Sequence, residues 1–418
     1  MKRYDLIVVG GGPAGIFAAG FAAKNGARVL LLEKNRRCGA KLLITGKGRC
    51  NLTNNEPDVR KFAEMFGRNG RALLTALYAF TGGDLIRFFE KQGLKLKIER
   101  GGRVFPEQGG AEDVQKVLDR FITETGVELQ CSSPVLDFCL EGDHILSVRT
   151  AKGELFAERF IVATGGLSYP ETGSTGDGYR WATETGHALM HPEPALVSIR
   201  LREKWTSEVM TINLKNVNLS VWQNGKKITE RFGETFFTRD GIGGPIVLDM
   251  SAAIRDALKK GGVSLQLDMK PAVESATFAK RLERELKEQN NKDFRNALGN
   301  FLPKDMIATF IDLSGIDPNK KCHSVTREER GRLLGLFKSL ELNVVGCEGF
   351  DRAIITSGGV ALQDVDMRTM RSKRISNLFF AGEILDLDAP TGGFNLQLCW
   401  STGHLAGISA ARKGGCTP

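Results

Sequence analysis

The stretch DLIVVGGGPAGIFAAGFAAKNGARVLLLEKN, residues 5–35, decides the fold. Leu6–Val9 is a short, largely β-branched run, which predicts a buried parallel strand. The alanine-rich segment Ile16–Lys24 predicts a helix that ends at Asn25-Gly26, and Val29–Leu32 predicts a second strand. This order of strand, helix and strand is typical of an α/β domain with a dinucleotide site.

The junction between the first strand and the helix carries the pattern G-x-G-x-x-G. The first glycine permits a tight turn, the second lets a pyrophosphate approach the backbone, and the third lets helix and strand pack closely. The start of the helix then offers free N–H groups and a partial positive charge to the anion. The residues of this predicted phosphate site are Gly10, Gly12, Pro13, Ala14 and Gly15.

Glu33 closes the second strand, where an acidic side chain suits the paired hydroxyls of a ribose. A 2′-phosphate at this position would meet a like charge, which disfavours the adenosine half of NADP. We include the next residue, Lys34, in the predicted site.

The loop TGKGRCNLTN, residues 45–54, is polar and glycine-rich, and it predicts neither a helix nor an ordinary strand. A nicotinamide enzyme would normally continue with further strand–helix units at this point. A long polar loop instead suits a larger cofactor that extends past its pyrophosphate, and FAD fits. The expected cofactor contacts in and before this loop are Lys41, Thr45, Gly46, Gly48, Arg49, Cys50 and Asn51, with Cys50 favoured as a packed thiol.

Two later segments predict further parts of the same domain. Ala111–Thr125 has the apolar spacing of an amphipathic helix, and Val127–Gln130 follows as a strand. The backbone of Val135 is expected near an adenine edge. A second buried strand, Phe160–Ala163, ends in small residues that let a cofactor approach the backbone. The site residues predicted here are Val135, Ala163, Thr164 and Gly165.

The C-terminal part of the chain again predicts a strand followed by a glycine-rich loop and a helix. The strand is expected at Leu378–Ala381, and the helix begins at about Asn395. Glu383 is expected to accept hydrogen bonds from ribityl hydroxyls. Amides at the start of the helix would stabilise the negative charge of a reduced flavin. The site residues predicted here are Gly382, Glu383, Gly392, Gly393, Asn395 and Leu396.

Composition and charge indicate which partners and metal sites to expect. The chain has 418 residues and a net charge of +9, with basic residues scattered and no basic arm, so a nucleic-acid partner is not favoured. Eight cysteines stand at 38, 50, 131, 139, 322, 347, 399 and 416, without C-x-x-C pairs or zinc-ligand spacing. We therefore expect no metal site and a cytoplasmic location. No stretch is expected to span a membrane, and no membrane partner is expected.

Taken together, several motifs resemble the BaiN/YhiN-like flavoproteins, a family described as NAD(P)/FAD-dependent oxidoreductases or aminoacetone-oxidase-family FAD enzymes. Residues 45–54 and AGEILDLDAPTGGFNLQ (381–397) are the most specific, since the N-terminal glycines occur in many flavoproteins. One motif departs from the family pattern: relatives commonly have Thr-His-aromatic-Gly-x-Ser-Gly-Pro where residues 238–245 read TRDGIGGP. The other matching segments are GGRVFPEQGGAEDV (101–114), TGGLSYPETGSTGDGY (164–179) and SGGVAL (357–362).

The resemblance implies an α/β fold with a glutathione-reductase-type FAD-binding Rossmann domain made from both chain ends. An insert would carry a β-barrel-like part and a small helical part. The expected boundaries are 1–190 and 346–418 for the FAD-binding domain, and 191–345 for the insert, β-rich over 191–270 and helical over 271–338. An Asn224-Gly225 hairpin turn and a Thr326/Glu329 capping box agree with this reading.

The resulting hypothesis is an FAD-dependent oxidoreductase that passes electrons from a donor, NAD(P)H as a transient partner, to a small organic substrate. No second G-x-G-x-x-G occurs, so molecular oxygen or another carrier stays open as the electron partner. Catalytic side chains and oligomeric state are not assigned, and His404 is expected to point away from the flavin. Two alternatives remain: an RNA-associated flavoprotein, in keeping with the positive charge, and a non-catalytic FAD-binding sensor.

Overall fold

The computed structural model describes residues 3–210 and 212–412 and divides into two compact units. One unit covers 1–194 and 353–418, and the other is Ala195–Arg352. Both boundaries lie later than the predicted 190 and 345. The first boundary is later because β10 (Leu189–Ala195) pairs with β17 (Ile355–Val360) and so stays largely with the first unit. The second is later because β16 (Leu340–Cys347) belongs to the barrel of the second unit.

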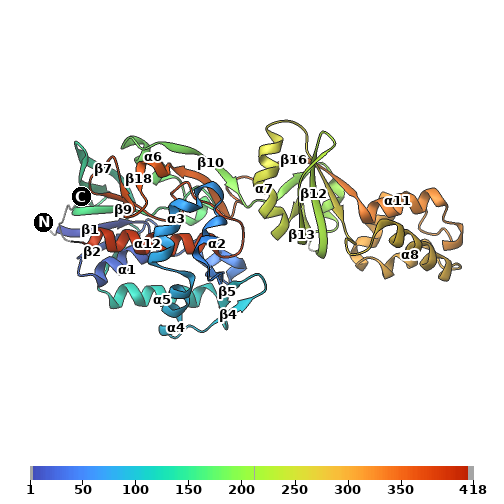
Figure 1. Ribbon diagram of the computed structural model, residues 1–418, viewed down its shortest axis with the longest axis horizontal. Coiled ribbons are helices and arrows are strands. Elements are labelled where there is room, and N and C mark those ends of the chain that lie inside the picture. The colour runs from blue at the N-terminus through green and yellow to red at the C-terminus, as the bar shows by residue number, and fades with distance from the viewer. Residues whose placement is uncertain (1–2, 211, 413–418) are drawn as a thin grey trace. The chain divides into compact units, whose positions relative to one another are not determined.

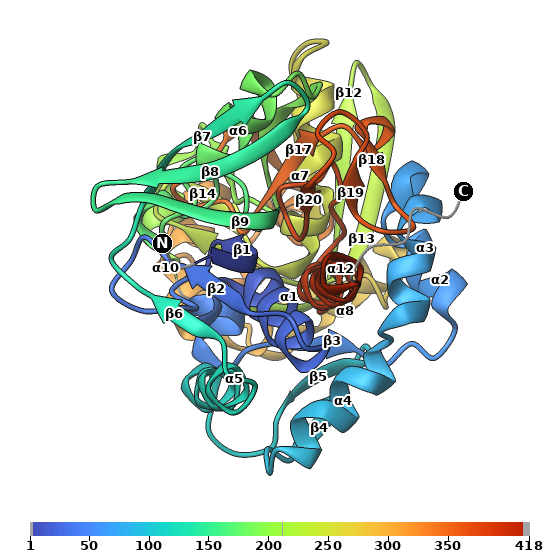
Figure 2. The same ribbon diagram turned by 90° about the vertical axis from the view of Figure 1, so that its left-hand side faces the viewer.

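The first unit is built on a parallel sheet with the order β20-β9-β1-β2-β6. Figure 2 shows β9, β1, β2 and β6 following one another across this sheet. In register, Leu6 lies opposite Val29 on one side of β1 and opposite Arg159 on the other. The two predicted apolar runs are buried on both faces, as expected for a parallel sheet covered by helices. The strands are β1 (Arg3–Val9), β2 (Val29–Leu32), β6 (Glu128–Gln130), β9 (Gly153–Val162) and β20 (Leu378–Phe380).

Antiparallel strands extend this sheet. A hairpin of β7 (Val135–Glu141) and β8 (His144–Thr150) joins β9, and β18 (Val365–Asp366) with β19 (Arg371–Ser372) joins β20. Together with β9, the hairpin forms a three-stranded antiparallel β-meander.

Helix α1 (Pro13–Lys24) and helix α12 (Phe394–Ala411) lie side by side on the sheet, although they come from opposite ends of the chain (Figures 1 and 2). Two glycines make the contact possible. A side chain at Gly403 would clash with the carbonyl of Ala14, and one at Gly407 with the carbonyl of Ala18. The predicted helix Ala111–Thr125 is α5 (Ala111–Glu124), which packs beside α1. The two chain ends therefore form one core through close backbone contact.

A group of elements between residues 53 and 106 was not predicted from the sequence. Phe80, which follows α3, and Phe88 of α4 contact the ring of Phe17 in α1. The bounds of these two helices and of the neighbouring elements are β3 (Thr53–Asn54), α2 (Val59–Glu64), α3 (Gly70–Ala79), α4 (Gly82–Lys91), β4 (Leu96–Glu99) and β5 (Arg103–Pro106).

The segment Gly67–Lys91 corrects the expectation that no stretch is long and apolar enough to span a membrane, since by length and composition it passes that test. It is not one continuous helix. Phe80 is extended, and Thr81 begins α4 with a capping box to Asp84. Leu73, Leu77 and other apolar residues of the segment are buried in the core. One such segment is weak evidence, because core helices of soluble proteins also pass the test.

His404 lies within this core, between aromatic rings. Its ring is 4.5 Å from the Phe21 ring and 4.9 Å from the Phe80 ring, and its buried Nδ1 has no hydrogen-bond partner among the described residues. Burial lowers the pKa of His404 to about 4, although Asp84 opposes the shift. His404 is thus a neutral packing residue.

We expect this burial to make the fold sensitive to acid. A histidine near its ordinary pKa of about 6.5 when unfolded takes up a proton that the folded state excludes. Stability should therefore fall as the pH drops below about 6.5, with about 2 kcal/mol lost between pH 7.5 and pH 5 from this group. Urea unfolding at both pH values, compared with a His404→Leu variant, isolates the contribution. An equal pH dependence in the two proteins would contradict it.

The second unit contains a closed barrel with the order β11-β14-β13-β12-β15-β16. The hairpin turn predicted at Asn224-Gly225 joins β12 to β13, and both residues have positive φ, 49° and 73°. Helix α7 (Pro245–Leu258), which was not predicted, packs against the barrel. The strands are β11 (Ile199–Leu201), β12 (Asn213–Gln223), β13 (Lys226–Thr238), β14 (Gly241–Gly243), β15 (Ser264–Asp268) and β16 (Leu340–Cys347).

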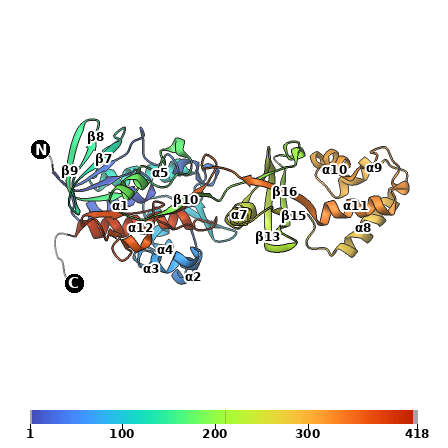
Figure 3. The same ribbon diagram turned by 90° about the horizontal axis from the view of Figure 1, so that it is seen from above.

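Four helices form the small helical part of this unit (Figure 3). Helix α8 lies in the stretch 271–338 that was predicted to be helical, and the predicted Thr326/Glu329 capping box begins α11. The closed barrel and these helices confirm the predicted fold class. The helices are α8 (Ser275–Glu288), α9 (Phe294–Ala297), α10 (Ile307–Ser314) and α11 (Arg327–Lys338).

Candidate functional site

A pocket in the first unit lies where four parallel strands end: β1, β2, β9 and β20. Ligands of open α/β sheets bind at such carboxyl ends, at the point where the strand order reverses. Here that point is β1, which the chain leaves toward β2 on one side and joins again through β9 on the other. Of the predicted site residues, the pocket is lined by Gly10, Gly12, Pro13, Ala14, Glu33, Lys34, Lys41, Val135, Ala163, Thr164, Gly165, Gly382 and Glu383.

The three glycines of the first motif differ in what surrounds them. Gly10 has φ 110°, and a Cβ atom there would lie 2.5 Å from the carbonyl oxygen of Ala163. A Cβ at Gly15 would clash with the carbonyl of Gly10. A Cβ at Gly12 would meet no atom within 4 Å. Gly12 thus leaves an open cradle at the N-terminus of α1, where backbone amides favour an anion.

Glu33 is anchored at the end of β2 and is only 8% exposed. Its Oε2 accepts a 2.7 Å hydrogen bond from the Gly11 amide, and its Oε1 accepts one of 2.7 Å from the Asn35 amide. Each carboxylate oxygen can accept a further bond. The carboxylate is therefore fixed in direction and can still receive ribose hydroxyl groups.

We expect a Glu33→Ala variant to bind FAD more weakly by about 1–3 kcal/mol, because charge-assisted bonds to the ribose are lost. Flavin fluorescence on titrating FAD into the flavin-depleted full chain gives the dissociation constant. FMN, which lacks the adenosine ribose, serves as the control ligand and should bind both proteins alike. An unchanged dissociation constant for FAD would remove Glu33 from the cofactor site.

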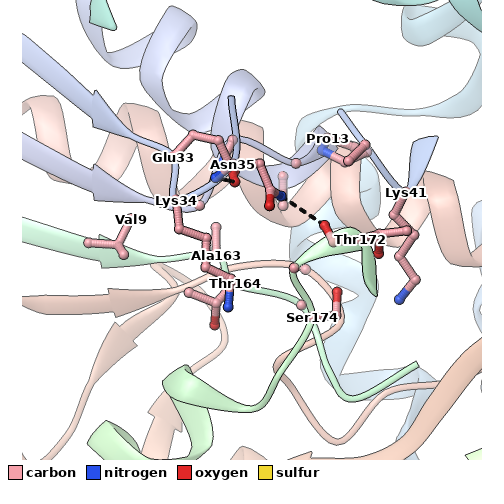
Figure 4. A pocket seen from close by; sticks show the side chains of 18 of the residues that line it. Val9, Pro13, Glu33, Lys34, Asn35, Lys41, Ala163, Thr164, Thr172 and Ser174 are labelled. Carbon is pink, nitrogen blue, oxygen red and sulfur yellow. Dashed lines mark hydrogen bonds between the residues drawn. The ribbon is translucent and has the colours of Figure 1, made fainter. Parts of the chain in front are cut away.

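A loop before α6 (Asp177–Glu184) is tied across the pocket to the end of β2. Lys34 Nζ donates to the Asp177 carboxylate at 2.7 Å and to the Thr175 hydroxyl at 2.5 Å. Asn35 Nδ2 donates to the Thr172 carbonyl at 2.9 Å, the dashed line in Figure 4. These bonds hold two segments, far apart in the sequence, as opposite walls of one pocket.

Lys41 and Glu383 form a half-buried ion pair beside the pocket. Lys41 Nζ lies 2.7 Å from Glu383 Oε2 and also donates to the Ser168 hydroxyl. Glu383 Oε1 accepts from the Ser168 hydroxyl at 3.1 Å and from the Thr356 amide at 2.8 Å. Glu383 was predicted to accept hydrogen bonds from ribityl hydroxyls, and Lys41 was predicted to contact the cofactor. In this structure the two side chains form an ion pair with each other.

The loop of residues 45–54 is irregular, as predicted. It begins in the 3-10 segment Leu42–Gly48, which Thr45, Gly46 and Lys47 interrupt with non-helical backbone angles. The Arg49 guanidinium pairs with the Glu99 carboxylate and lies 4.1 Å from the Phe105 ring centre. The structure therefore does not bring Arg49 to this pocket, since a nearby carboxylate and an aromatic ring already bind its side chain.

The end of the same loop contacts the N-terminus of α12. Gly393 has φ 98°, and a side chain there would clash with the backbone of Thr53. Asn54 Nδ2 donates to the Gly392 carbonyl at 3.1 Å, and Trp400 Nε1 donates to the Leu52 carbonyl at 3.0 Å. The two most specific motifs are thus neighbours in space.

Some predicted site residues do not line the pocket. They are Gly15, Thr45, Gly46, Gly48, Arg49, Cys50, Asn51, Gly392, Gly393, Asn395 and Leu396.

The thiols near the site are packed. Burial raises the pKa of Cys50 to about 12 and that of Cys399 to about 12, so neither forms a thiolate readily. Cys50 is fully buried, in agreement with a packing role. None of the seven cysteines among the described residues is in a disulfide, and Cys416 lies outside them.

The residues present fit FAD. Gly12 leaves a cradle for a diphosphate at a helix N-terminus, and Glu33 faces the pocket from the end of β2. One buried polar atom of a lining residue, Thr164 Oγ1, has no hydrogen-bond partner among the described residues. Buried polar groups are normally satisfied, so a ligand with donors and acceptors would complete it. The individual contacts with FAD stay predictions.

Other pocket residues were missed. Four of them lie within the glycine-rich stretch TGSTGDGY (172–179), whose composition was a usable signal, and Trp181 follows it closely. Cys399 lies in the predicted C-terminal helix, and the rest lie at or after predicted strand ends. The missed lining residues are Val9, Gly11, Leu32, Asn35, Gly39, Ala40, Leu42, Ser133, Thr172, Gly173, Ser174, Asp177, Trp181, Ala381 and Cys399.

The chain matches a known protein family along almost its whole length. The model of the HI0933-like protein Rossmann domain matches residues 4–409. The chain belongs to the HI0933-like family. It is 30% identical to the 3-dehydro-bile acid delta(4,6)-reductase of Clostridium scindens, over 97% of this chain and 98% of that protein. It is 28% identical to the ribosomal RNA dihydrouridine synthase of Escherichia coli, over 96% of each chain.

Solved structures agree on the fold of this HI0933-like protein. The 3-ketosteroid-delta4-(5alpha)-dehydrogenase of Rhodococcus jostii has a TM-score of 0.57 at 16% identity, covering 99% of this chain and 97% of the other. The open conformation of a flavocytochrome c3 fumarate reductase has a TM-score of 0.55 at 18% identity, covering 98% and 78%. The family, its oxidoreductase members and the pocket make the chain an FAD-dependent oxidoreductase, as the motifs predicted.

Proposed function

We propose that this protein uses FAD to reduce a carbon–carbon double bond conjugated to a carbonyl group in a small organic substrate, with NAD(P)H as the electron donor. The observation that carries the proposal is shared chemistry among full-length relatives. One is named for reducing the double bonds of a 3-dehydro-bile acid, and the other for making dihydrouridine, which saturates a ring double bond of uracil next to a carbonyl. Their substrates differ widely, whereas the bond type is the same.

The residues of this chain supply binding and orientation. FAD, when bound, supplies the hydride chemistry. Amides at the start of α1 and the open position at Gly12 would hold the diphosphate, and Glu33 would fix the adenosine ribose. The sequence has no second G-x-G-x-x-G, so NAD(P)H would bind only transiently, before the acceptor.

A second candidate is reduction of uridine within ribosomal RNA. The net charge of +9 favours it, because a polyanionic substrate gains affinity from a positive protein. Dihydrouridine synthases of Escherichia coli and Haemophilus influenzae are both 28% identical to this chain. The two candidates share the donor half of the reaction and differ in the acceptor.

Anaerobic stopped-flow spectroscopy tests both halves. The FAD-loaded protein is mixed with NADH or NADPH while loss of the flavin absorbance is followed, and the reduced protein is then mixed with an acceptor. Reoxidation by a cyclic enone, with a saturated product, supports the proposal. Reoxidation by ribosomal RNA alone supports the second candidate.

Two outcomes would contradict the proposal. A flavin that dithionite reduces but neither nicotinamide reduces would exclude NAD(P)H as the donor. A reduced flavin that no conjugated acceptor reoxidises faster than buffer would exclude the reductase activity and favour an FAD-binding sensor.

A further inference from the structure

Trp181 lines the cofactor pocket with an unsatisfied donor. It lies in α6 and is only 4% exposed, yet its buried Nε1 has no hydrogen-bond partner among the described residues. A buried indole N–H usually finds an acceptor, because leaving it unpaired in the folded protein is costly. An acceptor on a bound ligand would satisfy it.

Two other tryptophans, Trp222 and Trp400, show the usual behaviour. Trp222 Nε1 donates to the Ser220 hydroxyl at 2.8 Å, and Trp400 Nε1 donates to the Leu52 carbonyl at 3.0 Å. Trp181 differs from these two tryptophans because its N–H has no partner among the described residues, and because it lines the pocket.

The Trp181 ring is held in place on both sides. The ring of Phe138 meets it edge-on, with centroids 5.1 Å apart and planes at 80°, and the Arg180 guanidinium lies 5.6 Å from its centre. These contacts restrict rotation of the ring, so the buried indole N–H has little freedom to turn toward solvent. The residue that carries this N–H is part of the pocket lining.

The surroundings of Trp181 indicate which part of the ligand it meets. Asp177, one turn earlier on α6, lines the same pocket and is tied to Lys34 at the end of β2. Glu33, the predicted ribose partner, directly precedes Lys34. Val135, which begins the strand that also carries Phe138, lines the pocket as well. This is the adenosine end of the predicted site, where ring nitrogens and ribose oxygens supply acceptors.

We propose that Trp181 is a cofactor-binding residue whose indole N–H donates a hydrogen bond to the adenosine half of FAD and whose ring forms a wall of that subsite. The residue then both positions the cofactor and selects for a nucleotide with an acceptor at that place. The inference depends on FAD binding and not on the identity of the reduced substrate.

The first test measures FAD affinity of the full chain by equilibrium dialysis. Trp181→Phe keeps an aromatic ring and removes the N–H, so the dissociation constant should rise about 5- to 30-fold. Trp222→Phe is the matched control, since its N–H already has a protein partner in the other unit, and it should bind FAD like the wild type. An unchanged affinity in Trp181→Phe would overturn the proposal.

The second test does not depend on affinity or activity. The full chain is labelled with ¹⁵N-tryptophan, and the indole N–H signals are assigned with the Phe variants. When FAD is added to flavin-depleted protein, the Trp181 proton should shift downfield and exchange more slowly with water. The Trp222 signal should stay in place. A Trp181 signal that is identical with and without FAD would overturn the proposal, even if the Phe variant proved unstable.

Discussion

A Gly12→Val variant should fold normally and contain no FAD. Gly12 has φ −81°, which valine can adopt, and a Cβ there meets no protein atom within 4 Å. The added side chain would instead fill the space that the diphosphate needs at the start of α1. Purified variant should show a flavin-to-protein ratio near zero, with a circular dichroism spectrum like that of the flavin-depleted wild type.

The matched control is Gly331→Val on α11, where an added Cβ also meets no atom within 4 Å. That variant should keep its full flavin content. Gly15→Val would be less informative, because its side chain would clash with the Gly10 carbonyl and disturb folding itself. Full flavin occupancy in Gly12→Val would show that the diphosphate lies elsewhere.

A Phe17→Ala variant should lose about 3–5 kcal/mol of stability in the first unit. Phe17 is completely buried in α1, and its ring contacts Phe80, Phe88 and Trp400 at centroid distances of 5.4, 5.1 and 4.7 Å. These partners come from the helical segment 70–91 and from α12. Truncating the ring leaves a cavity where both meet α1, and such a cavity cannot collapse without moving a helix.

Urea unfolding of the flavin-depleted full chain, followed by a signal from the first unit, measures this loss. Phe232→Ala is the control, because Phe232 is 56% exposed on the barrel and its removal should change stability little. A loss below about 1 kcal/mol for Phe17→Ala would mean that the three helices are not held by this cluster.

The parts that the sequence predicted well are those with local patterns. The apolar run before Gly10 gave β1, the Asn224-Gly225 pair gave the hairpin, and Thr326 with Glu329 gave the start of α11. In each case neighbouring residues determine the backbone, so no distant contact is needed to recognise the element.

The parts that were missed depend on contacts between distant residues. In the segment 59–91, Phe80, Phe88 and Phe89 pack against aromatic rings of α1 and α12. The sequence of this segment alone does not show that these rings lie next to it. Lys41 was predicted to contact the cofactor, but Glu383, far away in the sequence, forms an ion pair with it. The positive charge of a lysine predicts that it will pair with a negatively charged group. It does not predict whether that group belongs to the cofactor or to the protein.

The backbone contact between α1 and α12 has a consequence for biosynthesis. Gly403 and Gly407 lie against Ala14 and Ala18, and the whole barrel and its helices are encoded between them. While the polypeptide is still emerging from the ribosome, α1 must therefore wait for a helix that is encoded after the whole second unit. The nascent chain completes its middle region before α12 can pack on α1 and before Gly382 and Glu383 can join the pocket.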